Sequence, residues 1–297
     1  MCSALIQRNG IQRGKDERKN LVLKRIFLIC FIYLFSFTPM VFASPNPPNI
    51  TAKSAIVIEA FTGKIIYGKN AEERRYPAST TKIMTLITAL EQGNLEDVLT
   101  VSTNAANTEG SSIYLEAGER LKMVDMLYGV MLLSGNDATV AVAEHISGST
   151  EKFAQLMTNK AHAIGAVHTN FTNPNGLPNP NHYTTAHDLA IITAYGYQNP
   201  LFRQIVGTKH KTIPWNNKGY DRDLYNENKL LWMYNGAIGV KTGYTEVAGP
   251  CLVSSATRNN VQLIAVILDA EQMWEDSKAL LDFGFSKLRP IELFEQG

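Results

Sequence analysis

Segments typical of β-strands stand near both ends of this 297-residue chain, and a mainly helical stretch separates them. Residues 55–60 and 64–67 are rich in apolar and β-branched residues and flank Phe61-Thr62-Gly63, which predicts a hairpin. Three more strand-like segments lie at 237–241, 251–256 and 261–268. The simplest fold for this order is of the α/β (α+β) class: one antiparallel sheet closed by strands from both ends, flanked by helices, with a mainly helical insert.

The stretch between these strands has helical periodicity. An apolar stripe begins after Ser79 and stops at Gly93-Asn94, and residues 121–165 continue the pattern with breaks at 134–136 and 147–149. Two further helices are predicted over residues 185–197 and 275–285.

Residues 1–43 are predicted to be a signal peptide. Lys24 and Arg25 precede an apolar run over 26–37, and Val41-Phe42-Ala43 forms a small-residue cleavage site. The run is shorter than the about 20 residues that a membrane-spanning helix needs, although an uncleaved anchor is the alternative. We expect cleavage after Ala43 and export to the periplasm or the outer face of the cytoplasmic membrane.

The rest of the chain is predicted to be a linker over 44–53 and one domain over 54–297. Residues 1–43 hold seven of the 28 basic and two of the 27 acidic residues, so the remainder carries 21 basic and 25 acidic side chains. Without a basic surplus, nucleic acid is not an expected partner. Only Cys251 remains after cleavage, which excludes an internal disulfide, and it is expected to be a small buried side chain.

Six histidines are scattered without the spacing of a metal site, so neither a metal nor another cofactor is expected. They are interpreted as helix-surface or loop residues: His145, His162, His168, His182, His187 and His210.

Three short motifs follow one another along the chain: Ser79-Thr80-Thr81-Lys82, Ser134-Gly135-Asn136 and Lys241-Thr242-Gly243. Together they offer a nucleophile, two amines, a second hydroxyl and an amide, which suits attack on an acyl bond without a histidine base or a metal. Each motif alone is weak evidence, because a second Ser-x-x-Lys occurs at Ser149 to Lys152. The ordered triple is the informative feature.

The first motif predicts a serine nucleophile with a lysine base. Side chains three apart on a helix are neighbours, so Lys82 can reach Ser79 Oγ. The amine acts as a base only when neutral, which requires burial or a nearby cation to lower its pKa, and Lys241 is a candidate for that cation. A serine at a helix start also offers a backbone N–H to an oxyanion, although alone it would be an ordinary helix cap.

The other two motifs predict substrate contacts. Ser134 can relay a proton and Asn136 can hold a substrate amide, from a turn between two helices. Lys241 and Thr242 can bind an anionic group at the predicted end of a strand, and Gly243 allows a ligand backbone to approach closely.

With these residues the chain resembles the serine-type D-alanyl-D-alanine carboxypeptidases, the low-molecular-mass penicillin-binding proteins, from about Ala55 to Leu288. The matching residues are Arg75-Tyr76-Pro77-Ala78-Ser79 with Lys82, Leu133-Ser134-Gly135-Asn136-Asp137-Ala138, Asn175-Gly176-Leu177, Thr185-Ala186-His187-Asp188, Gly239-Val240-Lys241-Thr242-Gly243-Tyr244-Thr245 and Ala248-Gly249. The resemblance implies a beta-lactamase/penicillin-binding transpeptidase-like fold for a D,D-peptidase domain.

The resemblance also implies a role for each residue. Ser79 would form the acyl-enzyme with Lys82 as base, and Ser134 would pass the proton to the leaving amine. The oxyanion hole would be the N–H groups of Ser79 and Tyr244. Asn136 would hold the acyl-side amide, and Lys241, Thr242 and Gly243 would bind around the substrate carboxylate. The implied substrates are peptidoglycan stem pentapeptides, which lose their terminal D-alanine, and beta-lactams are the implied covalent inhibitors.

Two departures from the family pattern stand out. The sequence stops at Gly297, without the β-rich domain and C-terminal amphipathic anchor of many relatives, so no stable membrane anchor is expected after cleavage. Relatives often place an arginine before the last helix, near the substrate carboxylate, whereas residues 269–276 contain none. We therefore expect weak, salt-sensitive affinity for small substrates unless another group replaces it.

Three other functions are alternatives to a D,D-carboxypeptidase. A D,D-endopeptidase that cleaves peptidoglycan crosslinks would use the same residues. A class A beta-lactamase needs a glutamate after the second motif, and residues 165–185 contain none. A catalytically silent wall-binding or beta-lactam-binding module would be expected to lack one of the five polar motif residues, and all are present.

Overall fold

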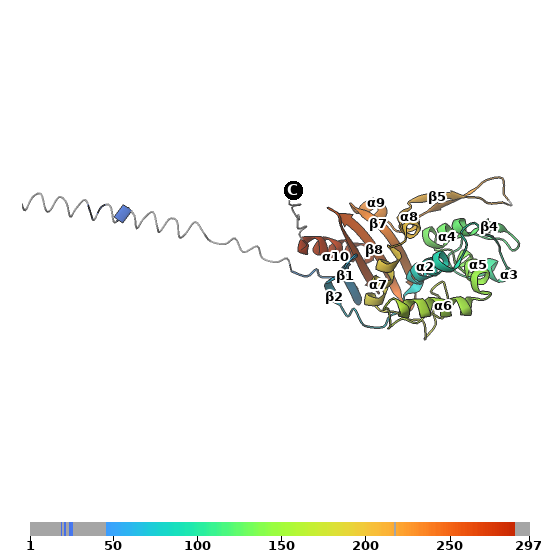
Figure 1. Ribbon diagram of the computed structural model, residues 1–297, viewed down its shortest axis with the longest axis horizontal. Coiled ribbons are helices and arrows are strands. Elements are labelled where there is room, and N and C mark those ends of the chain that lie inside the picture. The colour runs from blue at the N-terminus through green and yellow to red at the C-terminus, as the bar shows by residue number, and fades with distance from the viewer. Residues whose placement is uncertain (1–18, 20, 22–23, 26–45, 217, 289–297) are drawn as a thin grey trace, which may run out of the picture. The chain divides into compact units, whose positions relative to one another are not determined.

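The computed structural model describes residues 19, 21, 24, 25, 46–216 and 218–288 (Figure 1). The chain divides into two units, residues 1–44 and 45–297. The predicted cleavage site at Ala43, most of the predicted signal peptide and residues 289–297 lie outside the described residues. Among the described ones, no helix combines the length and the apolar character that crossing a bilayer requires.

The second unit is built around a five-stranded antiparallel sheet of order β2-β1-β9-β8-β7 (Figure 1). Its strands are β1 (Ser54–Glu59), β2 (Ile65–Lys69), β7 (Ala237–Thr245), β8 (Gly249–Arg258) and β9 (Val261–Leu268). Strands β1 and β9 pair along their length, with Ser54 opposite Leu268 and Glu59 opposite Leu263. The prediction of a sheet closed by strands from both ends of the chain is confirmed.

Both faces of this sheet are covered, because alternate residues of a strand point to opposite sides. Ala55 and Val57 pack in one core with α10 (Met273–Lys287). Ile56 and Ile58 belong to the larger core on the side of the helical insert. This double burial explains why β1 and β9 are nearly continuous apolar runs instead of alternating patterns.

The insert between β2 and β7 carries a series of helices joined by loops and short strands (Figure 1). The helices are the 3-10 turn η1 (Ala78–Thr81) and the α-helices α2 (Lys82–Gln92), α3 (Thr103–Ala106), α4 (Met123–Leu132), α5 (Asn136–Ser147), α6 (Thr150–Ala163), α7 (Ala186–Gly196), α8 (Pro200–Gly207) and α9 (Leu230–Met233). Helix α7 packs on β1 and β9, and α8 packs on β7. The insert therefore packs on one face of the sheet, from β1 and β9 across to the edge strand β7.

Two small sheets complete the fold and were not predicted. They are β3 (Val98–Thr100) with β4 (Arg120–Lys122), and β5 (His210–Ile213) with β6 (Arg222–Tyr225). Strands of three or four residues carry too few alternating positions to stand out in a sequence. Cys251, in β8, is free and fully buried, as expected.

Candidate active site

Ser79 and Lys82 stand one turn apart where a helix begins. Ser79 lies in η1, and Lys82 is the first residue of α2. Lys82 Nζ donates a hydrogen bond to Ser79 Oγ over 3.0 Å. This is the contact that the spacing of the first motif predicts, because side chains three apart share one helix face.

The hydrogen bonds of Lys82 aim its amine at the serine. The side chain is fully buried, and Nζ donates to Ser79 Oγ, to Asn136 Oδ1 over 2.7 Å and to the Asn175 carbonyl oxygen over 2.8 Å. A neutral amine keeps two N–H donors and one lone pair. Since the two amide oxygens can only accept, a neutral Lys82 donates to them and directs its lone pair to the Ser79 hydroxyl.

Two effects favour that neutral form. Burial holds the pKa of Lys82 well below its usual value, and the positive charge of Lys241 lowers this pKa further. Lys241 is itself buried, and burial lowers its pKa to about 8 although Glu227 opposes the shift. Near neutral pH the arrangement therefore favours a neutral Lys82 beside a charged Lys241.

The turn between α4 and α5 forms the second wall of the site. Ser134 is buried there with a positive φ of 60°, and its Oγ has no hydrogen-bond partner in the described part of the chain. Asn136 Nδ2 donates to the Glu109 carbonyl oxygen over 2.7 Å. An NH₂ group has two donors, so Asn136 can still offer one N–H to a substrate carbonyl while its oxygen holds Lys82.

The third motif lies inside a strand, not at its end. Lys241, Thr242 and Gly243 sit within β7, which continues to Thr245, so the prediction that they close the strand is wrong. Lys241 Nζ donates to Thr242 Oγ1 over 3.4 Å. A Cβ at Gly243 would lie 3.0 Å from the backbone nitrogens of Ser79 and Thr80, so the glycine lets β7 approach the nucleophile.

The backbone N–H of Tyr244 points away from the sheet. Strand β7 is an edge strand, and Tyr244 lies opposite Pro250 of β8. The Pro250 carbonyl accepts from the Ala270 N–H over 3.0 Å and so points away from β7. Two directly opposed residues in an antiparallel pair either exchange both backbone hydrogen bonds or turn their N–H and C=O groups away from each other. The Tyr244 N–H therefore points outward from the free edge of β7, on the side of Ser79. This matches the predicted second donor of an oxyanion hole.

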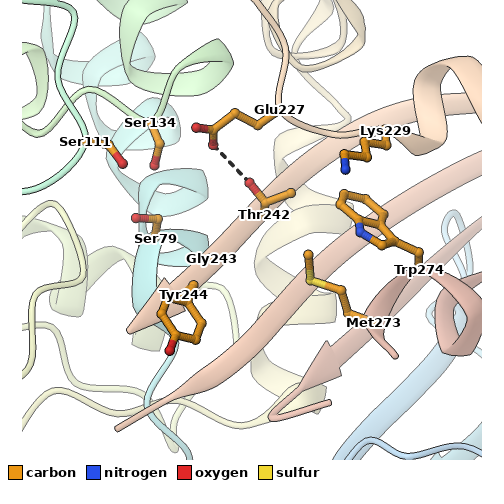
Figure 2. A pocket seen from close by; sticks show the side chains of 10 residues that line it. All are labelled: Ser79, Ser111, Ser134, Glu227, Lys229, Thr242, Gly243, Tyr244, Met273 and Trp274. Atoms are coloured by element: carbon orange, nitrogen blue, oxygen red, sulfur yellow. Dashed lines mark hydrogen bonds between the residues drawn. The ribbon is translucent and has the colours of Figure 1, made fainter. Parts of the chain in front are cut away.

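These walls enclose a cleft of about 470 Å³ (Figure 2). Its lining residues are Ser79, Ser111, Ser134, Glu227, Lys229, Thr242, Gly243, Tyr244, Met273 and Trp274. Lys82, Asn136 and Lys241 lie buried behind this surface. The structure thus brings together all eight predicted site residues, five of them on the cleft wall and three behind it.

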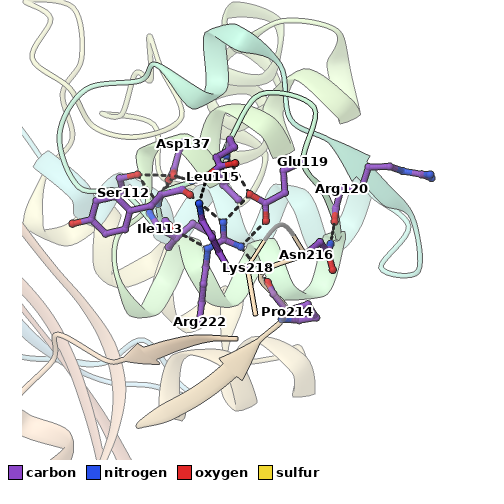
Figure 3. A network of polar contacts seen from close by, with 12 residues as sticks. Ser112, Ile113, Leu115, Glu119, Arg120, Asp137, Pro214, Asn216, Lys218 and Arg222 are labelled. Atoms are coloured by element: carbon purple, nitrogen blue, oxygen red, sulfur yellow. Dashed lines mark hydrogen bonds and ion pairs between the residues drawn. The ribbon is translucent and has the colours of Figure 1, made fainter. Parts of the chain in front are cut away.

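A buried polar network fixes the loop that forms one rim of the cleft (Figure 3). Asp137 accepts hydrogen bonds from the Ser112 hydroxyl and from the backbone N–H of Ile113 and Leu115. Arg222 donates to the Ile113 carbonyl over 2.8 Å and pairs with Glu119 through both its terminal nitrogens, at 2.6 and 2.7 Å. A bidentate pair of this kind sets orientation as well as energy.

Three contributors to the site were missed at the sequence level. The Glu227 carboxylate accepts from Thr242 Oγ1 over 3.2 Å and lies 3.7 Å from Lys241 Nζ. Lys229 lines the same cleft, and Asn175 provides the carbonyl that holds Lys82. Asn175-Gly176-Leu177 was part of the resemblance, but no pattern in the sequence connects Glu227 or Lys229 with the motifs.

His182 does not fit the surface role expected for the histidines. It is buried, its Nδ1 accepts from the Thr172 N–H over 3.1 Å, and its Nε2 lies 2.9 Å from Thr81 Oγ1. Burial lowers the pKa of His182 to about 4, and Lys82, when protonated, adds to this shift. A neutral imidazole therefore supports Thr81, inside the first motif.

The described residues contain no group of three or more His, Cys, Asp or Glu side chains placed to hold a metal ion. The chemistry derived from this site uses only hydroxyl, amine, amide and backbone N–H groups.

Comparisons with known proteins show the family of this chain. Residues 41–272 match the family model of the D-alanyl-D-alanine carboxypeptidases, peptidase family S11. The chain is 39% identical over 291 residues to the D-alanyl-D-alanine carboxypeptidase DacF of Bacillus subtilis, covering 92% of this chain and 74% of that protein. It is 36% identical to DacA of Haemophilus influenzae, covering 92% of this chain and 72% of that protein.

Solved structures give the same result. A D-alanyl-D-alanine carboxypeptidase from Mycobacterium tuberculosis superposes with a TM-score of 0.78 at 30% identity, covering 84% of this chain and 96% of that one. The Streptomyces K15 DD-transpeptidase superposes with a TM-score of 0.77 at 32% identity, covering 82% and 100%. The chain belongs to the serine D-alanyl-D-alanine carboxypeptidase family and has its penicillin-binding fold.

Proposed function

We propose that this protein is a serine D,D-carboxypeptidase that removes the terminal D-alanine from peptidoglycan stem pentapeptides through an acyl-enzyme. The observation that carries this proposal is the contact between Lys82 Nζ and Ser79 Oγ in a buried site that disfavours the ammonium. An activated serine needs a neutral base within hydrogen-bond distance, and Lys82 meets both conditions.

Acylation follows from the positions of the side chains. Lys82 takes the Ser79 hydroxyl proton as Oγ bonds to the carbonyl carbon of the penultimate D-alanine. The N–H groups of Ser79 and Tyr244 stabilise the oxyanion. The C–N bond to the terminal D-alanine then breaks, and the leaving nitrogen receives the proton through Ser134. Water later cleaves the ester and restores Ser79.

The remaining site residues hold the substrate on either side of the scissile bond. One N–H of Asn136 binds the acyl-side carbonyl, and Thr242 with Lys241 binds the carboxylate of the terminal residue beside Gly243. A beta-lactam places an amide and a carboxylate in the same relation, but its leaving nitrogen stays attached after ring opening. It should therefore remain bound to Ser79 as a stable ester.

We place this activity on the wall side of the cytoplasmic membrane, because peptidoglycan is found there. Residues 1–43 would act as the signal peptide and 44–53 as a linker to the catalytic domain that begins at residue 54. Intact-mass measurement of the protein recovered from the wall-side fraction tests this part. A chain that starts at Ser44 supports it, and a mass that includes residues 26–43 contradicts it.

The activity itself is tested with two substrates. Purified protein is incubated with a muropeptide pentapeptide and with a crosslinked muropeptide dimer, and released D-alanine and monomer are quantified. We expect D-alanine from the pentapeptide, none with Ser79→Ala, and parent activity with the matched control Ser149→Ala. Dimer cleavage without D-alanine release would instead identify a D,D-endopeptidase.

A further inference from the structure

The segment between β6 and α9 alternates between buried and exposed residues. Asn226 and Asn228 are buried, whereas Glu227 and Lys229 are exposed. Asn226 Nδ2 donates to the Thr208 carbonyl over 2.9 Å, and Asn226 Oδ1 accepts from the Asn228 N–H over 2.9 Å. The two buried asparagines anchor this turn, and the exposed side chains of Glu227 and Lys229 both line the cleft.

These two charged residues differ in their partners. Glu227 accepts from Thr242 Oγ1 and lies 3.7 Å from Lys241 Nζ. Lys229 forms no salt bridge with any carboxylate among the described residues. Its Nζ lies 6.0 Å from the centre of the Trp274 ring, at the end of the cleft that Trp274 and Met273 close (Figure 2). The Lys229 ammonium, which has no carboxylate partner among the described residues, thus lines the same cleft as Thr242, near the Trp274 ring.

The charges around Thr242 show why a second cation matters there. The carboxylate of the leaving residue has to approach Thr242, where the Glu227 carboxylate already accepts a hydrogen bond. Lys241 is the nearest cation, but its charge is shared with Glu227. Glu227 therefore offsets part of the attraction that Lys241 offers to an incoming anion, and a further cation would strengthen it. Lys229 is the other cationic side chain on the described cleft wall.

We propose that Lys229 binds the substrate carboxylate on the leaving side and so determines specificity for substrates that end in a free carboxylate. This inference rests on the proposed function, because it names the residue that binds the carboxylate of the leaving D-alanine. Trp274 and Met273, at the start of the last helix, line the same part of the cleft, and the centre of the Trp274 ring lies 6.0 Å from the Lys229 ammonium. Lys229 thereby provides the cationic contact to the carboxylate, since residues 269–276 contain no arginine to make it.

The test compares a charged with a neutral ligand. Acylation of Ser79 by benzylpenicillin and by its methyl ester is followed by intact-mass measurement, in the parent and in Lys229→Ala. Loss of one charge-assisted contact should slow acylation by the acid about tenfold. Acylation by the ester should stay within about twofold of the parent, and added salt should slow the acid reaction in the parent more than in the variant.

Two further variants separate charge from folding. Lys229→Arg should retain the preference for the acid, and Met273→Arg should restore much of it in the Lys229→Ala background. Lys209→Ala removes an exposed lysine on the neighbouring segment that does not line the cleft, and should change nothing. Equal slowing of acid and ester by Lys229→Ala, or no slowing of either, overturns the proposal. Absence of any adduct in the parent would instead refute the proposed function.

Discussion

The chain contains two Ser-x-x-Lys sequences, and the structure gives them opposite environments. At Ser79 the lysine amine is fully buried and contacts the serine hydroxyl. At Ser149 the hydroxyl accepts the backbone N–H of Lys152 over 3.2 Å as the N-cap of α6, and the Lys152 side chain is exposed. The same spacing therefore produces a candidate catalytic pair in one place and an ordinary helix cap in the other.

The difference shows that the surroundings of the lysine, and not the Ser-x-x-Lys spacing, determine whether the pair can act as nucleophile and base. Lys82 is surrounded by Asn136 and Asn175 oxygens and by the charge of Lys241, which arrive from segments 54, 93 and 159 residues away. The Lys152 side chain, by contrast, is exposed to water.

The largest effect should come from the base. Lys82→Arg keeps a cation but cannot supply a neutral amine, because guanidinium remains protonated. Acylation of Ser79 by benzylpenicillin should fall by about 10²–10⁴-fold, the usual cost of losing acid–base help. Stopped-flow or quenched mass measurement gives the rate. Lys152→Arg is the matched control and should behave as the parent; a loss of less than tenfold for Lys82→Arg would indicate another base.

A second effect concerns stability beneath the first motif. His182 has a pKa of about 4 in the fold against 6.5 in the unfolded chain, so the unfolded state binds the proton first as the pH falls. The free energy of unfolding should therefore drop between pH 6.5 and 4, by up to about 3 kcal/mol at 1.36 kcal/mol per unit. Urea unfolding at both pH values measures this drop. His182→Gln should flatten it and the exposed control His210→Gln should not; an equal slope in both would contradict the assignment.

A third effect should appear in alkaline solution. Because the pKa of Lys241 is about 8, raising the pH to 9 leaves about a tenth of its charge. The kcat/KM for D-alanine release should then fall about tenfold between pH 7 and 9, while acylation by the penicillin methyl ester should fall less. If D-alanine release and acylation by the methyl ester decline in parallel as the pH rises, Lys241 does not bind the carboxylate.

The smallest effect should come from Glu227, which raises the pKa values of both Lys241 and Lys82. Glu227→Gln should move the alkaline decline to lower pH and reduce kcat/KM at pH 8 by about two- to threefold. Glu246→Gln, at an exposed position after β7, is the matched control. A decline that stays in place in Glu227→Gln would mean that the carboxylate does not control the charge of Lys241.

Much of the fold could be predicted from the sequence because its signals are local. The β8–β9 hairpin is an example: Asn259 and Asn260 adopt positive φ values of 49° and 61°, which short polar residues tolerate in tight turns. The three motifs were also recognisable, since each is a continuous run. The end of β7 was misplaced because Lys241-Thr242-Gly243 was expected to close the strand, whereas β7 continues to Thr245 and Gly243 lets it approach Ser79.

The remaining parts of the site depend on contacts that no local pattern records. In the sequence, Glu227 and Lys229 resemble ordinary solvent-exposed charges between two short elements. Only the fold places them in the same cleft as Thr242. His182 has no neighbour in the sequence that signals burial, yet it supports Thr81 from 101 residues away.

Site mapping of the penicillin adduct identifies the nucleophile. The parent, Ser79→Ala and Ser149→Ala are treated with benzylpenicillin, digested and analysed by mass spectrometry. Ser79→Ala should fold normally, because a hydroxyl at a cleft wall contributes little stability. We predict one adduct, on the peptide that contains Ser79, which disappears in Ser79→Ala and persists in Ser149→Ala. An adduct that survives in Ser79→Ala, or that maps to another residue in the parent, would contradict the account.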